Sequence, residues 1–215
     1  MRLLVFSDLH GEETAVEKLK ELAAKENFDY VLSCGDNSRA VSFLEDLINS
    51  FSNFYLIPGN WEGKEANDFL LKNGHCIHGK RIELPDGLNL VGFGYSNKTP
   101  FGTYGEMEEK EIYEKMNKLD IDNNTILLLH CPPKGHFDSV GNANPGSSSI
   151  LKITEEKKPL VVFFGHIHEH EGTEKLDGST LVKVPAANSM KACIADISEG
   201  KLQYNKKTSV SFISL

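Results

Sequence analysis

Short apolar segments alternate with segments of helical periodicity in the first quarter of the chain. Residues 3–6 form an apolar run, and residues 12–26 follow with apolar side chains at helical spacing, Val16, Leu19, Leu22 and Ala23. Residues 30–34 and 54–57 are two further apolar runs, each followed closely by a glycine. A strand that is apolar on both faces needs cover on both faces, which helices provide on a parallel sheet. This alternation therefore predicts an α/β fold.

The second half of the chain has a different pattern. Pro85-Asp86-Gly87 is a turn signature before the apolar residues 88–93, and it predicts a hairpin. Residues 106–119 have the spacing of a charged helix. Later runs such as residues 180–184 are expected as antiparallel strands. Two sheets packed together, with helices outside, accommodate both halves of the chain.

Length and composition fit one domain. The chain has 215 residues, of which 40% are hydrophobic, and this is enough for one sizeable core. No glycine-rich or charged linker divides it, so residues 1–215 are expected to form a single domain. The first apolar run ends at Ser7 and Asp8, too early for a signal peptide, and no long apolar stretch follows. These features predict a cytoplasmic protein without a membrane segment.

Charge and cysteine usage argue against two kinds of site. The formal net charge of -8 and a pI near 5.5 count against an extended nucleic-acid surface, which needs clustered lysine and arginine. The cysteines have no C-x-x-C spacing, so neither a zinc knuckle nor a disulfide framework is indicated. A small anionic substrate is compatible with the acidic charge, because bound divalent cations can reverse the local sign of a cleft.

Polar motifs follow the expected strands. They are Asp8-Leu9-His10, Gly35-Asp36, Gly59-Asn60, His130 after the apolar residues 125–129, and Gly165-His166-Ile167-His168 after residues 160–164. Open α/β sheets bring the carboxyl ends of their strands together at one edge. Neutral imidazole combined with carboxylate oxygen favours manganese, iron, cobalt, nickel or zinc over an all-oxygen calcium site. The motifs therefore predict a metal site at this edge of the sheet.

Taken singly, most of these motifs have simpler explanations. Asp8 could cap a helix, and Asp36 and Asn60 are common turn residues. His166 and His168 are harder to explain without a ligand, because on a strand both rings would point to the same face. The occurrence of all the motifs in this order, each behind an apolar strand, favours one shared site.

With these motifs the chain resembles the calcineurin-like metallophosphoesterase superfamily. The family pattern runs Asp-x-His, Gly-Asp, Gly-Asn-His-Asp/Glu, a lone His and Gly-His-x-His, and the match extends from Asp8 to His168. The resemblance implies a four-layer αββα sandwich of two mixed β-sheets flanked by helices. It also implies two divalent metal ions, with manganese as the first choice and iron, zinc, nickel or cobalt as alternatives.

The resemblance implies a role for each motif residue. One metal ion would be held by a carboxylate and two imidazoles, from Asp8, His10 and His168. The second would be held by an amide and two imidazoles, from Asn60, His130 and His166. Asp36 would bridge the two ions. Two ions about 3.5–4 Å apart can hold a bridging hydroxide for in-line attack on phosphorus. On this pattern Asp36, Asn60 and His130 are also the expected catalytic residues.

Residue 61 departs from the family pattern. The histidine that usually follows Gly-Asn, and that is thought to assist the phosphate or the leaving group, is Trp61 here. An indole N–H donates a hydrogen bond but cannot protonate an alkoxide, and general acid catalysis often contributes about 10²–10⁴-fold. We expect Asn60, Trp61 and His136 to contact the substrate, with His136 as a candidate replacement acid. The simpler alternatives are rim packing for Trp61 and solvent exposure without function for His136.

The sequence thus predicts a dinuclear metal-dependent phosphoesterase that hydrolyses phosphodiesters or activated phosphate esters of small molecules. One alternative is a phosphomonoesterase or protein phosphatase with the same metals. Another is a non-catalytic partner-binding module on the same fold, against which the complete ligand set argues. The tail at residues 203–215 could be an edge strand or a contact in a homo-oligomer.

Overall fold

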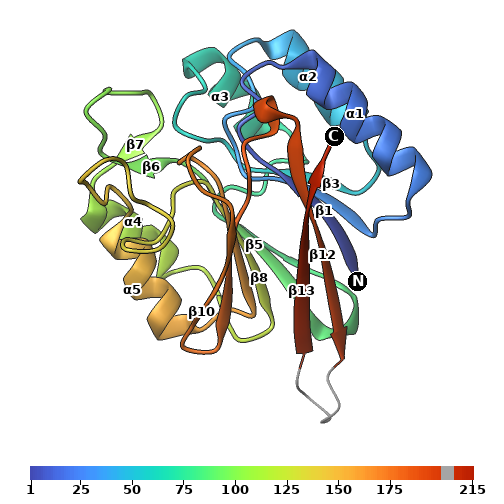
Figure 1. Cartoon of the computed structure of the whole chain (residues 1–215). Helices are drawn as coiled ribbons and strands as arrows, with labels where there is room; N and C mark the ends of the chain where they lie inside the picture. Colours follow the sequence, from blue (N-terminus) through green and yellow to red (C-terminus); the bar gives the residue numbers. More distant parts are fainter. Residues whose placement is uncertain (200–205) are drawn as a thin grey trace.

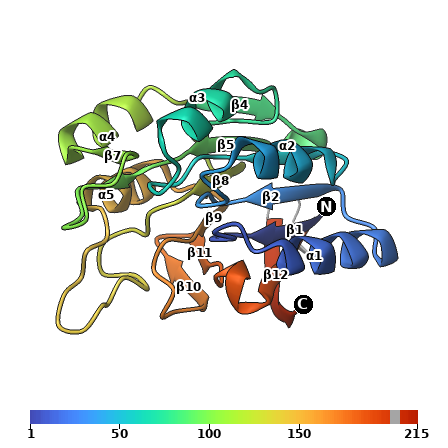
Figure 2. The same cartoon turned by 90° about the horizontal axis from the view of Figure 1, so that it is seen from above.

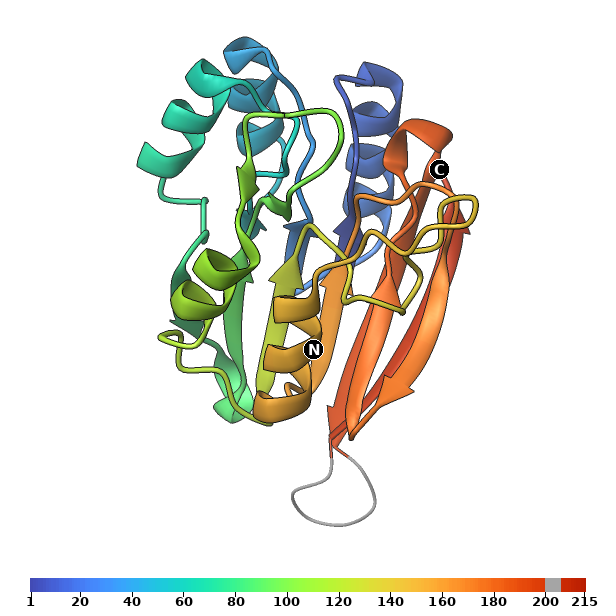
Figure 3. The ribbon, with the colours of Figure 1, turned by 90° about the vertical axis from the view of Figure 1, so that its left-hand side faces the viewer.

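Two β-sheets form the centre of the computed structural model, which describes residues 1–199 and 206–215 (Figure 1). The strands of the first sheet are β1 (Arg2–Phe6), β2 (Tyr30–Ser33), β3 (Phe54–Leu56), β12 (Lys191–Glu199) and β13 (Lys206–Ser214). They lie in the order β13-β12-β1-β2-β3. β1, β2 and β3 are parallel, whereas β12 is antiparallel to β1. The dark blue helix that follows β1 therefore lies beside the red C-terminal strands in Figure 3.

The second sheet has strands from the middle of the chain. They are β4 (Lys80–Glu83), β5 (Asn89–Phe93), β8 (Thr125–Leu129), β9 (Val161–Phe164), β10 (Gly172–Leu176) and β11 (Ser179–Lys183). Their order is β10-β11-β9-β8-β5-β4. A separate short pair consists of β6 (Ser96–Asn97) and β7 (Glu106–Met107).

Helices cover the outer face of each sheet. The first sheet carries α1 (Glu13–Lys25), α2 (Val41–Asn49) and α3 (Lys64–Lys72), and the second carries α4 (Glu109–Met116) and α5 (Ser148–Lys157). The two sets of helices lie on opposite sides of the paired sheets (Figures 1 and 2). The expected four-layer αββα sandwich of two mixed sheets is confirmed.

The alternation of side chains along β1 explains why the strand is apolar throughout. Leu4 and Phe6 pack with residues of α1–α3, whereas Leu3 and Val5 pack between the two sheets. All four side chains are fully buried, and each buried side chain of this size contributes roughly 1.5–3 kcal/mol. The same alternation on β8 directs Leu127 toward α4 and α5. Strands with both faces buried hold the ends of β1, β2 and β8 rigidly at one edge.

The predicted hairpin is confirmed, because β4 and β5 are antiparallel and a 3-10 turn at Pro85–Gly87 joins them. The predicted helix at 106–119 is wrong at its start. Glu106 lies in β7, where its carboxylate accepts hydrogen bonds from the hydroxyl groups of Thr99 and Thr103. These contacts are local to the loop, and the helix begins only at Glu109.

The direction of the strand near residues 180–184 was only partly predicted. β11 is antiparallel to β10, as expected, but parallel to β9. β13 is an edge strand of the first sheet, as one of the two expectations for the tail proposed; the part of that tail at 203–205 lies outside the described residues. None of the helices in the described residues combines the length and the apolar character that crossing a membrane requires.

Candidate metal centre

The loops after β1 and β2 are joined by backbone hydrogen bonds. The Asp8 N–H donates to the Gly35 carbonyl at 2.9 Å, and the His10 N–H donates to the Asp36 carbonyl at 2.9 Å. These bonds continue the pairing of the parallel strands beyond their ends. They bring Asp8, His10 and Asp36 next to one another, although the first two are far from Asp36 in sequence.

Four residues of the polar motifs have a left-handed backbone conformation. Asp8, His10, Asp36 and His166 have φ values of 56°, 49°, 52° and 71°. A non-glycine residue in this left-handed region costs about 1–3 kcal/mol and commonly marks a functional site. Here the strained conformations direct the side chains of adjacent loops toward a common point.

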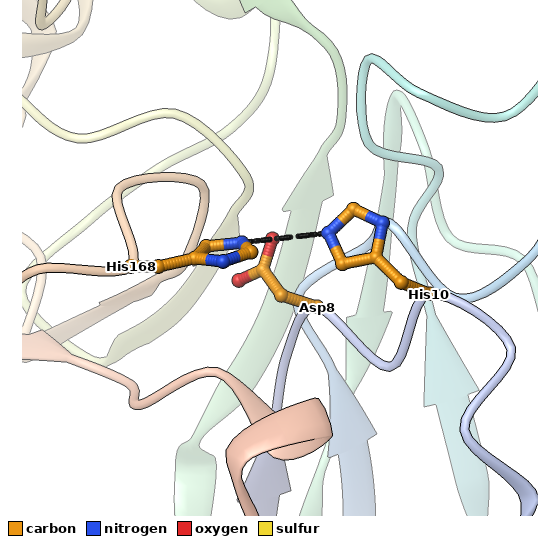
Figure 4. A group of neighbouring side chains, drawn as sticks. All are labelled: Asp8, His10 and His168. Carbon is orange, nitrogen blue, oxygen red and sulfur yellow. Dashed lines mark hydrogen bonds and ion pairs between the residues drawn. The ribbon is translucent and has the colours of Figure 1, made fainter.

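The first ligand group consists of Asp8, His10 and His168, whose ligand atoms all lie within 4.8 Å of one another. The Nε2 atoms of His10 and His168 are 3.4 Å apart, and the His168 Nε2 is 3.4 Å from Asp8 Oδ1. Figure 4 shows the two rings approaching from opposite sides, with the carboxylate between them. This arrangement offers two nitrogens and one oxygen to a cation.

The second ligand group consists of Asp36, His130 and His166, which also meet within 4.8 Å. The His130 ring is oriented by its Nδ1, which donates to the Cys34 carbonyl at 2.8 Å. Its Nε2 therefore points to the site, where it lies 2.9 Å from Asn60 Oδ1 and 3.5 Å from Asp36 Oδ2. A backbone acceptor on the outer ring nitrogen is typical of histidines that bind metal.

Asp36 lies between the two groups. Its Oδ2 is 3.9 Å from His10 Nε2 and 3.5 Å from His130 Nε2. Its other oxygen, Oδ1, accepts a hydrogen bond from the Trp61 N–H at 2.8 Å. The carboxylate is therefore held with one oxygen directed at ligands of both groups.

The residues fit a pair of divalent cations. Asp8 Oδ1 is buried and has no hydrogen-bond partner among the described residues, and an unsatisfied buried carboxylate oxygen is costly unless a cation binds it. Imidazole nitrogens, carboxylate oxygens and an amide oxygen converge here. This donor set suits borderline transition metals rather than calcium.

Burial and charge shift the pKa values of these residues in opposite directions. Burial alone would lower the pKa of His130, but the Asp36 carboxylate, with Asp8, raises it to about 9. Burial and the nearby His130 lower the pKa of His166 to about 4. Burial would raise the pKa of Asp8, but the adjacent His168 imidazole and the charge of His130 hold it well below its usual range. The two aspartates are therefore charged, which favours cation binding.

Two of the motif glycines are required by close approach. A Cβ atom at Gly59 would strike the Asp36 carboxylate, and one at Gly165 would strike the side chains of Ser7 and Asp8. The Gly-Asn and Gly-His pairs therefore let neighbouring loops come close enough for their carboxylates to reach the site.

The expectation that His166 and His168 lie on a strand and face the same way is wrong. β9 ends at Phe164, and His166 adopts a left-handed conformation in the loop beyond it. The turn separates the two rings, so that His166 belongs to the second group and His168 to the first. One short motif thereby contributes to both halves of the centre.

The two other expected substrate contacts occupy different places. The Trp61 ring lies edge-on to the His10 ring, with 4.8 Å between centroids, and the Arg39 guanidinium covers its face at 4.4 Å. His136 instead places its Nδ1 3.1 Å from the Glu174 carboxylate, on β10. Trp61 thus borders the first ligand group, whereas His136 pairs with a strand of the second sheet.

Two residues that are hydrogen-bonded to the loops of the metal centre were not assigned a role from the sequence. Glu62 is buried and accepts hydrogen bonds from the Asn37 and Gly59 N–H groups, both at 2.8 Å. Its burial and the nearby Asp36 raise its pKa to about 8. Thr103 accepts a hydrogen bond from the Asn60 side chain. The acidic residue beside Trp61 was a visible signal for Glu62, but no motif marks Thr103.

Comparisons with known proteins agree with this geometry. An uncharacterized protein of Methanocaldococcus jannaschii is 32% identical over 203 residues, which cover 88% of this chain and 89% of that protein. A solved structure described as a novel archaeal phosphodiesterase has a TM-score of 0.56 and 15% identity, over 98% of this chain and 100% of the other. A dimetal phosphatase from Danio rerio has a TM-score of 0.63 and 10% identity, over 97% and 98% of the two chains. At such identities the two structures support the fold alone.

The family comparison goes further. The model of the calcineurin-like phosphoesterase superfamily domain matches residues 1–191, which include every candidate metal ligand. This chain therefore belongs to the calcineurin-like phosphoesterase superfamily and is a metal-dependent phosphoesterase.

Proposed function

We propose that this protein hydrolyses phosphodiesters or activated phosphate esters of small molecules with a dinuclear metal centre. The observation that carries the proposal is the position of Asp36, whose Oδ2 lies within 3.9 Å of His10 in one group and 3.5 Å of His130 in the other. A carboxylate placed between two sets of nitrogen ligands is suited to bridge two cations.

The proposed ligands follow from the two groups. One ion would be held by Asp8, His10 and His168, the other by Asn60, His130 and His166, with Asp36 shared. When bound, two divalent ions supply charge for the phosphoryl oxygens and lower the pKa of water. Manganese is our first choice, and iron, zinc, nickel or cobalt would fit the same donors. Asp36, Asn60 and His130 are the proposed catalytic residues.

Trp61 supports a substrate whose leaving group needs little protonation. The side chain that follows Asn60 is an indole beside His10, and an indole supplies no titratable proton. Arg39 has its guanidinium on the Trp61 ring and its Nε bonded to the Trp61 carbonyl at 3.0 Å. We propose that Asn60 and Trp61 contact the substrate. His136 stays a weaker candidate, because its Nδ1 is engaged by Glu174.

The two solved structures support different substrate classes. The archaeal phosphodiesterase supports the proposal, and the phosphatase from Danio rerio supports the alternative of a phosphomonoesterase or protein phosphatase. We further propose that residues 1–215 act as one cytoplasmic domain without an extended nucleic-acid surface. A homo-oligomer formed along the edge strand β13 is a prediction that sedimentation velocity would check.

The test compares two substrates that share one leaving group. The purified chain is freed of metal, reconstituted with Mn²⁺, and assayed on bis-p-nitrophenyl phosphate and p-nitrophenyl phosphate. We expect a higher kcat/KM for the diester. Faster turnover of the monoester would overturn the proposal in favour of a phosphomonoesterase. Fewer than about two bound ions in excess Mn²⁺, with no hydrolysis of either ester, would exclude the two-metal centre.

The variant Trp61→His examines the missing acid on an alkyl phosphate monoester such as glycerol phosphate, because its alkoxide leaving group needs a proton whereas p-nitrophenolate does not. If an absent proton donor limits monoester hydrolysis, an imidazole at this position should raise monoester turnover, up to about 10²-fold, at the lower end of general acid effects. Trp61→Phe removes the indole without adding an acid and is the matched control. An unchanged monoester rate in Trp61→His would show that a proton donor at residue 61 is not what sets the substrate preference.

A further inference from the structure

The amide of Asn60 is oriented by a residue from a distant loop. Its Nδ2 donates to the Thr103 hydroxyl at 2.7 Å. Thr103 lies between β6 and β7, and the same loop contacts the Asn60 backbone, because the Gly105 N–H donates to the Asn60 carbonyl at 3.0 Å. A Cβ atom at Gly105 would strike the backbone of Gly59 and Asn60. The loop is therefore fitted closely against this candidate ligand.

The direction of the hydrogen bonds follows from the carboxylate of Glu106. Glu106 Oε1 lies 2.7 Å from the Thr103 hydroxyl and 2.7 Å from the Thr103 N–H. Burial would raise the pKa of Glu106, but the hydrogen bonds from Thr99 and Thr103 lower it to about 2. An ionised carboxylate only accepts hydrogen bonds, so the Thr103 hydroxyl must donate to it. The lone pairs of that hydroxyl are then left to accept from Asn60.

The direction of these hydrogen bonds decides which end of the Asn60 amide faces the metal centre. Because Thr103 accepts, the group that faces it must be the Asn60 NH₂, and Oδ1 must point the other way. Oδ1 accordingly lies 2.9 Å from His130 Nε2, beside Asp36. A flipped amide would present N–H donors to the centre, where they would repel a cation and leave the Thr103 hydroxyl facing an oxygen.

We propose that Thr103 is a positioning residue that keeps the carbonyl oxygen of Asn60 directed at the second metal ion. The inference rests on the proposed function, in which Asn60 is a ligand. Within the described part of the chain the side chain of Thr103 is hydrogen-bonded to Asn60 and Glu106 and to no other candidate ligand, so it acts on metal affinity through the orientation of the Asn60 amide. Partners of this kind typically change metal affinity or activity by about 10–100-fold.

Thr99 provides a matched control on the same loop. Its hydroxyl also donates to Glu106 Oε1, and it accepts from the Phe101 N–H at 3.2 Å. Among the described residues, Thr99 forms no hydrogen bond with Asn60. Thr103→Val and Thr99→Val therefore both remove a hydroxyl from Glu106, but only Thr103→Val removes the acceptor of the Asn60 amide. Thr103→Ser restores the hydroxyl and should restore the parent behaviour.

The experiment is isothermal titration of the metal-free chain with Mn²⁺, with circular dichroism to check that each variant is folded. We expect the parent chain to bind two ions, and Thr103→Val to bind one ion as before and the other about 10–100-fold more weakly. Thr99→Val and Thr103→Ser should keep both affinities within about threefold of the parent. The loss in Thr103→Val should appear without any substrate.

The outcomes separate this inference from the proposed function. A parent chain that binds fewer than two ions would contradict the dinuclear centre itself. A parent that binds two ions, with Thr103→Val binding both equally well, would overturn the role of Thr103 alone. Equal losses in Thr99→Val and Thr103→Val would also overturn it, because they would trace the effect to the packing of Glu106 and the loop. Failure of Thr103→Ser to recover would do the same.

Discussion

The two ligand groups share Asp36 as a neighbour but differ in their access to solvent. In the first group the side chains of His10 and His168 are 23% and 41% exposed. In the second group His130 is fully buried and Asp36 is 6% exposed. The first group is thus open on its histidine side, whereas the second, in which only His166 is half-buried, is less accessible.

The difference arises from where the histidines leave the sheets. His130 follows β8, an inner strand between β5 and β9, and a backbone carbonyl holds its outer nitrogen. His10 and His168 lie in loops that lead toward α1 and β10. The ligands of the second group are therefore better preorganised for a metal ion, because buried side chains lose less freedom on binding. We expect the ion of the first group to exchange more readily with solvent.

The largest effect is expected from a substitution of Asp36, the residue that the two groups share. Asp36→Asn keeps the shape of the side chain but removes the shared charge, so we expect both ions to bind more weakly. Activity on the diester should fall by more than about 100-fold, beyond the usual effect of residues that only support a ligand. The measurements are kcat/KM and Mn²⁺ titration.

Asp46→Asn, an exposed carboxylate on α2, is the control for this variant and should behave as the parent chain. If Asp36→Asn lowered the affinity for one ion and left the other unchanged, Asp36 would belong to a single group. The comparison would then be between two independent sites.

The second prediction concerns pH. At neutral pH a proton on His130, whose pKa is raised to about 9, competes with a metal ion for Nε2. Affinity at the second group should therefore rise about tenfold per pH unit from pH 7 to about 9 and then level off. The dependence should be weaker at the first group, because burial lowers the pKa of His10 although the Asp8 carboxylate raises that of His168. Mn²⁺ titrations at several pH values would measure both.

The same pKa shift has an opposite effect on the stability of the metal-free chain. A histidine with a raised folded pKa stabilises the fold fully below its unfolded pKa of about 6.5. That stabilisation is lost as the pH rises through about 9. The measurement is the difference in free energy of unfolding between the metal-free parent chain and His130→Gln, which should fall between pH 7 and 9. A difference that rose over this range would contradict the charge assigned to His130.

The smallest effect is expected on the free energy of unfolding, when one histidine of either group is replaced by alanine. His130→Ala leaves the buried Cys34 carbonyl and the Asn60 amide oxygen without a donor, and should lower the free energy of unfolding by about 1–3 kcal/mol. His168→Ala removes a half-exposed ring that lies 3.4 Å from the Asp8 carboxylate, and should lower it by less, about 0.2–1 kcal/mol. Urea denaturation of the metal-free variants would measure the difference. Equal losses would mean that the second group is no more firmly held than the first.

Local patterns were sufficient to predict the layers and the candidate ligands. An apolar run such as residues 3–6, followed by a segment of helical periodicity, is typical of a strand with both faces covered, and parallel strands bring their carboxyl ends to one edge. The motifs at Asp8 and Asp36 could therefore be placed together before any contact was known. Local patterns failed where backbone conformation was decided by partners. The helix expected from residue 106 begins later, because Glu106 is engaged by Thr99 and Thr103.

The sequence by itself determined the family, the four-layer architecture and the residues that can bind metal, because these depend on periodicity and on side-chain chemistry. Only the tertiary structure decided how His166 and His168 are divided between the two groups, since that depends on a left-handed turn beyond β9. It also decided which way the amide of Asn60 points, since the acceptor is Thr103, 43 residues away. Such distant contacts carry no local signal, because they exist only once the two loops are packed together.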